Sequence, residues 1–162
     1  MFETVEFQVQ TGQVISCAKK GYVLVPIDKI SIYAMGKVAI YPQAELRQLQ
    51  QMKQIDRKNF DRNPDNENRL LEIKKLKHNY ERSRSMFASL QQVGFTDSVD
   101  DLNNIILHLL DIGDRVTLDN RVNYISSLEG LNGELRVLST WVILPDGTKY
   151  LSTINFIPRQ ER

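Results

Sequence analysis

Apolar and polar residues alternate near both ends of the chain, whereas the middle repeats its apolar residues every three or four positions. Val5 and Phe7 alternate with polar neighbours and Gly12 supplies a turn, which predicts a hairpin over residues 4–17. A short apolar strand is expected at residues 22–25, and helical spacing predicts a short helix over residues 27–34. The N-terminal part is therefore expected to mix strands with a helix.

The middle of the chain is predicted to be helical. Helical periodicity indicates helices over residues 43–53 and 68–92, and the Asn- and Asp-rich residues 59–68 between them are expected to form a loop. Ser98 can cap a strongly amphipathic helix that follows it, and Gly113 is expected to end that helix.

Two turn signals, Asn132-Gly133 and Asp146-Gly147, predict three antiparallel strands at the C-terminal end. If both turns are two-residue loops, Trp141 pairs with Tyr124 and the alternation assigns each residue to a face. The predicted core face is Val122, Tyr124, Leu128, Val137, Trp141, Ile143, Tyr150, Ile154 and Phe156. The opposite, mixed face is Ile125, Arg136, Thr140, Val142, Leu151, Thr153 and Asn155.

Together these patterns predict an α+β fold, in which an N-terminal hairpin and helices pack on a C-terminal three-stranded antiparallel meander. The length of 162 residues favours one domain over residues 1–162, with residues 37–70 as a charged helical and loop insertion.

Composition narrows the classes of function. The net charge is +1, so nucleic acid could be held only by a local basic patch. The single cysteine, Cys17, permits no disulfide within the chain and favours a reducing compartment, so a cytoplasmic location is expected. No apolar run reaches the roughly 20 residues of a membrane span, and no closely spaced His and Cys residues indicate a structural zinc site. We expect neither a cofactor nor a metal.

A basic stretch on the long predicted helix carries the first candidate chemistry. His78 and Arg82 fall on one helical face, with Lys77 and Arg84 nearby. An imidazole can move protons near neutral pH, and guanidinium and ammonium groups hold phosphate, a combination that suits RNA cleavage. The same pattern is also that of a solvated helix face with scattered charges.

The mixed sheet face carries the second candidate chemistry. Thr140 and Thr153 are expected to be cross-strand neighbours, with Arg121 nearby, and such groups can hold a phosphate or position an RNA backbone. Paired threonines are equally ordinary stabilising neighbours on a sheet.

Several short motifs occur in a familiar order. They are Pro26-Ile27-Asp28-Lys29 with Tyr33, then His78 and Arg82 before Phe87 and Gly94, then Gly130-Leu131-Asn132-Gly133 followed by Trp141 and Thr153. This order resembles an uncharacterised bacterial domain family, whose members occur at the C-termini of polymorphic toxins and as small stand-alone proteins encoded beside a short companion protein. The resemblance covers roughly residues 22–36 and 76–158. It implies a toxin-like role and a cognate neutralising protein. It also favours Lys29, His78, Arg82 and Thr153 as site residues over the other polar residues of the chain.

The leading hypothesis is a toxin-like, metal-independent endoribonuclease that acts on cytosolic RNA. His78, Arg82 and Thr153 are its predicted catalytic residues, and the predicted phosphate-binding residues are Lys29, Lys77, Arg84, Arg121 and Thr140. The alternatives are a non-enzymatic protein-interaction module and a nucleic-acid-binding regulator that uses the basic stretch.

Overall fold

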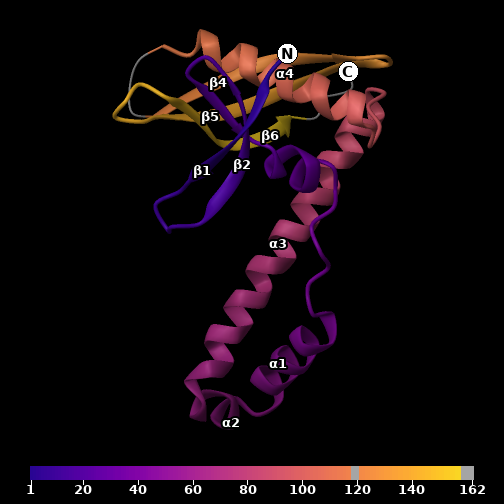
Figure 1. Cartoon of the computed structure of the whole chain (residues 1–162). Helices are drawn as coiled ribbons and strands as arrows, with labels where there is room; N and C mark the ends of the chain where they lie inside the picture. The colour runs from indigo at the N-terminus through magenta and orange to yellow at the C-terminus, as the bar shows by residue number, and fades with distance from the viewer. Residues whose placement is uncertain (118–120, 158–162) are drawn as a thin grey trace.

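The computed structural model describes residues 1–117, the backbone of Arg121 and residues 122–157. The elements in chain order are β1 (Glu3–Gln8), β2 (Val14–Lys20), β3 (Val23–Pro26), η1 (Lys29–Ala34), α1 (Gln43–Ile55), α2 (Arg57–Arg62), α3 (Pro64–Gln92), α4 (Val99–Arg115), β4 (Arg121–Gly130), β5 (Gly133–Ile143) and β6 (Lys149–Ile157). The α+β class is confirmed. All six strands form one sheet in the order β1-β2-β3-β6-β5-β4, whereas the C-terminal meander was predicted as a separate three-stranded sheet (Figure 1).

A short parallel pair joins the N-terminal and C-terminal strands into this one sheet. β3 pairs with β6 at Val23–Lys149 and Leu24–Tyr150, and the Tyr22 carbonyl accepts a hydrogen bond from the Lys149 amide at 2.7 Å. Every other pair of neighbouring strands is antiparallel. The parallel pair connects residues more than a hundred positions apart, and no local turn signal announces such a contact.

Helix α4 covers one face of the sheet (Figure 1). Ser98 caps it as predicted, because its side chain accepts a hydrogen bond from the Asp101 amide. The expectation that Gly113 ends the helix is wrong, since α4 continues to Arg115. A Cβ on Gly113 would lie 2.4 Å from Val23 Cγ1 and 2.8 Å from the Trp141 ring. The glycine therefore permits close helix–sheet packing.

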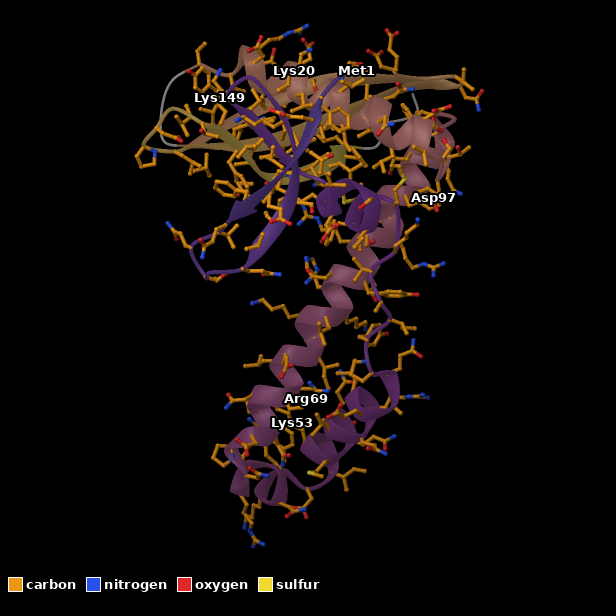
Figure 2. The ribbon with its side chains drawn as sticks, viewed as in Figure 1. Met1, Lys20, Lys53, Arg69, Asp97 and Lys149 are labelled. Carbon is orange, nitrogen blue, oxygen red and sulfur yellow. The ribbon has the colours of Figure 1, made fainter. Side chains whose placement is uncertain are left out.

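Helix α3 leaves the sheet and carries α1 and α2 at its far end (Figure 1). We call residues 43–80 the helical arm. It has its own small core, separate from the main one, made of Leu46, Leu49, Phe60, Leu70 and Ile73. Figure 2 shows Lys53 and Arg69 at this far end, where their side chains form ion pairs with Glu67 and Glu45 at 3.1 Å and 2.8 Å.

The prediction of a loop over residues 59–68 is wrong. This segment holds most of α2 and the start of α3. Polar side chains cap both helices: Asp56, before the segment, accepts a hydrogen bond from the Asn59 amide, and Asn63, within it, accepts one from the Asp65 amide. Pro64 occupies the first turn of α3, where its missing amide costs nothing.

The β4–β5 hairpin turns at Leu131-Asn132, one residue earlier than predicted. Trp141 consequently pairs with Val122, and the predicted pairing with Tyr124 is wrong. The Val93 carbonyl at the end of α3 accepts a hydrogen bond from the Asn132 amide at 3.0 Å, so a tertiary contact holds this turn. The faces are unchanged, because the pairing moves by two positions along a strand of period two.

The β5–β6 pairing has a bulge that exchanges two residues between the faces. Thr140 pairs with Thr153 as predicted, but Trp141 pairs with Leu151, so Ser152 is an extra residue in β6. Leu151, predicted on the mixed face, is therefore fully buried in the main core. Tyr150, predicted on the core face, lies on the other face with its ring centroid 5.5 Å from that of Phe7.

Candidate functional site

A pocket of about 390 Å³ lies where η1, α3 and β6 meet. We call it the β6 pocket; its lining residues are Asp28, Lys29, Ile32, Tyr33, Arg82, Ser152, Thr153 and Ile154. β3 pairs with β6 only at Val23 and Leu24, and β6 then continues past the end of β3. The pocket thus forms beyond the end of the parallel pair, beside the part of β6 that β3 does not cover.

Arg82 is held at the pocket by contacts on two sides. Its Nη2 donates a hydrogen bond to the Ile154 carbonyl at 3.4 Å, and its guanidinium carbon lies 5.9 Å from the centre of the Tyr33 ring. At the next residue, the buried Ser83 hydroxyl donates a hydrogen bond to the Tyr33 carbonyl at 2.6 Å and ties α3 to η1. These contacts fix the guanidinium while other donors of its fork remain available to an anion.

Lys29 supplies the second cation of the pocket, from the first residue of η1. Its side chain is half-buried, and this burial lowers the pKa of Lys29 below its usual 10.5, although the thiol of Cys17 has the opposite effect. Burial raises the pKa of Cys17 to about 11, so this fully buried thiol stays protonated and unreactive at neutral pH. Cys17 is therefore part of the packing beneath Lys29.

The bulge brings hydroxyl groups to the same pocket. Ser152 and Thr153 both line it, and Thr153 is exposed. In a regular strand, successive side chains point to opposite faces, and an extra residue lets neighbours share one side. The pocket consequently combines two cations, the Asp28 carboxylate, two hydroxyls and the aromatic ring of Tyr33, so its cations outnumber its anions by one.

Three of the eight predicted site residues meet here: Lys29, Arg82 and Thr153. His78 does not line the pocket. It is exposed on α3, four residues before Arg82 on the same helical face, which places it roughly 6 Å away along the helix axis.

The other predicted residues lie elsewhere. Lys77 is 3.9 Å from Glu81 and 6.0 Å from the centre of the Tyr41 ring, and Arg84 donates to the Tyr80 hydroxyl at 2.9 Å. Thr140 is buried and donates to Asn123 Oδ1 at 2.8 Å. The side chain of Arg121, at the start of β4, lies outside the described residues.

Asp28, Ile32 and Ser152 line the pocket although none of them was a predicted site residue, and only Asp28 belonged to a motif named above. Tyr33 belongs to the motif that also contains Lys29, and its ring faces the Arg82 guanidinium. The position of Ser152 depends on the Pro145-Asp146-Gly147 loop, in which the Gly147 amide donates to the Leu144 carbonyl at 2.9 Å with φ of +87° at Gly147. This loop has three residues where two were predicted, and Ser152 restores the register farther along β6.

The second histidine, His108, is on α4, and its side chain contacts β4. Its Nε2 is 2.9 Å from the Ser126 hydroxyl oxygen, and burial lowers the pKa of His108, with Asp111 acting in the opposite direction. Among residues 1–117 and 122–157, no three His, Cys, Asp or Glu side chains are grouped so that they could hold a metal ion. Within those residues, no helix has the length and apolar character needed to span a membrane.

The fold and the pocket define a mixed α+β protein with a cationic, hydroxyl-lined candidate site. No known protein family matches this chain, and no curated protein is significantly similar to it.

Proposed function

We propose that the β6 pocket binds a backbone phosphate of RNA and that the protein is a toxin-like, metal-independent endoribonuclease. The observation that carries the proposal is the meeting of Lys29, Arg82 and Thr153 around one pocket, although they come from three elements far apart in the sequence. Two cations beside hydroxyl groups suit an anion that also accepts hydrogen bonds, as a phosphodiester does. The apolar side of Ile32 and the Tyr33 ring suit the sugar or base attached to it.

Cleavage would proceed by attack of the 2′-hydroxyl on the adjacent phosphorus. The bond from the 2′-oxygen to phosphorus forms while the bond from phosphorus to the 5′-oxygen breaks, leaving a 2′,3′-cyclic phosphate and a 5′-hydroxyl. His78 takes the proton from the 2′-hydroxyl, and the Lys29 ammonium gives a proton to the departing 5′-oxygen. Arg82 stabilises the charge that develops on phosphate, and Thr153 positions the backbone.

The test is digestion of purified tRNA, rRNA and mRNA by the wild-type protein, with and without a chelator. We expect cleavage that a chelator does not stop and products that end in a cyclic phosphate. His78→Ala and Lys29→Met should each lower the rate about 10²- to 10⁴-fold, the usual contribution of a proton-transfer group. Intact RNA in all wild-type reactions would refute the nuclease assignment.

Binding without cleavage is the second candidate, and the position of His78 outside the pocket lining favours it. A nucleic-acid-binding regulator would retain RNA in a manner that weakens steeply with salt, and would leave it intact. A cognate neutralising protein is the expected partner only if the protein is a toxin. Induced expression should arrest bacterial growth if the protein is a toxin, whereas a regulator should not do so.

A further inference from the structure

The cations of α3 fall into two groups with different surroundings. Those that face α1 or lie near it are neutralised: Arg69 lies 2.8 Å from Glu45 and 3.0 Å from Glu72, and Lys77 lies 3.9 Å from Glu81. Within the described part of the chain, Lys74 and Lys75 have no carboxylate within 4.0 Å, and both are exposed. Lys74 and Lys75 are therefore cations of α3 whose charge no nearby carboxylate offsets.

The unneutralised groups form a row that ends at the pocket. Lys74, His78 and Arg82 are four residues apart, and Lys75 lies beside them within the same third of the helix circumference. We call these four residues the basic stripe. It extends for about 12 Å along the axis, from the exposed Lys74 to Arg82 in the pocket lining. A nucleic-acid strand carries one phosphate per nucleotide, so more than one phosphate can lie along a row of this length.

We propose that the basic stripe binds a single-stranded segment of RNA continuous with the nucleotide in the β6 pocket, so that the preferred substrate is a strand several nucleotides long. This inference rests on the proposed function of the pocket. A single strand fits better than a duplex, because the nucleotide held between η1, α3 and β6 must leave any base stack to enter. One row of basic side chains on one helix matches one backbone, whereas a duplex presents two.

The residues next to the basic stripe favour RNA over an acidic polypeptide as its binding partner. At the pocket end the row meets the Tyr33 ring and Ile32 next to Arg82, which offers a stacking surface beside the charge. A planar base attached to a phosphate uses both features, whereas a carboxylate side chain uses only the charge.

The experiment compares a random-sequence RNA of about twelve nucleotides with a pool of dinucleotides, using Lys74→Glu/Lys75→Glu and the wild type. The matched control is Lys58→Glu/Arg62→Glu, which changes net charge equally at exposed positions of α2, away from the pocket. We expect the stripe variant to bind the longer RNA at least tenfold more weakly and to bind dinucleotides within twofold of wild type. The salt dependence of long-RNA binding should fall by about 0.7 per lysine removed.

Equal weakening by the stripe variant and the control would overturn the inference, as would wild-type binding of the longer RNA by the stripe variant. An acidic polypeptide that displaces the RNA at equal concentration would assign the stripe to a protein partner. Arg82→Ala keeps the two proposals distinguishable. If it leaves dinucleotide binding unchanged, the pocket proposal fails; if it abolishes dinucleotide binding while the stripe variant behaves like wild type, only the stripe inference fails.

Discussion

The guanidinium of Arg82 donates a hydrogen bond to the backbone carbonyl of Ile154, 3.4 Å away, and so joins the middle of α3 to β6 at the pocket. The residues are 72 positions apart in the chain. This contact leaves the remaining guanidinium donors of Arg82 beside Ser152 and Thr153. The long helix therefore supplies the candidate site with a cation at the place where it crosses the sheet.

Removing this cation should weaken anion binding far more than it destabilises the fold. A hydrogen bond to a charged group contributes about 1.5–3 kcal/mol, so Arg82→Ala should lower the affinity for dinucleotides about 10- to 100-fold. A dinucleotide titration followed by NMR would measure this affinity. Arg84→Ala is the matched control, because Arg84 contacts Tyr80 and does not line the pocket. Similar losses in both variants would contradict the assignment.

Anion binding in the pocket should weaken at alkaline pH. Burial lowers the pKa of Lys29 below 10.5, so the ammonium group loses its charge at a lower pH than an exposed lysine does. Affinity measured from neutral pH up to about pH 10 should therefore fall in the wild type. Lys29→Arg, whose side chain stays charged, should bind with little change over this range. If the affinity of the wild type does not change with pH, the charge of Lys29 does not contribute to anion binding.

Adding one methyl group to Gly113 should destabilise the protein. Its Cβ would lie 2.4 Å from Val23 Cγ1 and 2.8 Å from the Trp141 ring, so the helix or the sheet must shift. We expect Gly113→Ala to cost about 1–3 kcal/mol of unfolding free energy, although alanine is the better helix former. Urea denaturation gives the value. Asn104→Ala, at an exposed position of the same helix, should be neutral or slightly stabilising.

The thiol of Cys17 should make stability depend on alkaline pH. Its pKa is 9.0 when unfolded and about 11 when folded, so the unfolded chain loses this proton first. The stabilisation from the buried neutral thiol is complete below pH 9 and is lost as the pH rises through 11. Lys29, with its lowered pKa, contributes the opposite slope.

The difference between wild type and Cys17→Ala in urea denaturation isolates the contribution of the thiol from that of Lys29. We expect the wild type to lose more stability than the variant between about pH 8 and pH 10.5. Slow reaction of the native thiol with a disulfide reagent at pH 8 is the matching chemical test. Rapid labelling of the native protein would contradict the burial of Cys17.

The sequence alone determined the local features of this protein. The Ser98 cap, the extent of α1 and the alternation along β5 follow from interactions within a few residues, so periodicity and capping reveal them. The same local reasoning placed Lys29 on a short helix after β3, and His78 and Arg82 on one face of a long helix.

Only the tertiary structure decided which of these residues meet. The β3–β6 pair, the docking of the β4–β5 turn on Val93 and the bulge at Ser152 each depend on contacts between distant segments, and none leaves a local pattern. The three-residue Pro145-Asp146-Gly147 loop and the bulge together moved Leu151 into the core and set Ser152 beside Thr153 at the pocket, because one extra residue reverses the faces of a strand. The sequence supplied the charged and hydroxyl groups, and packing selected Lys29, Arg82 and Thr153 from among them.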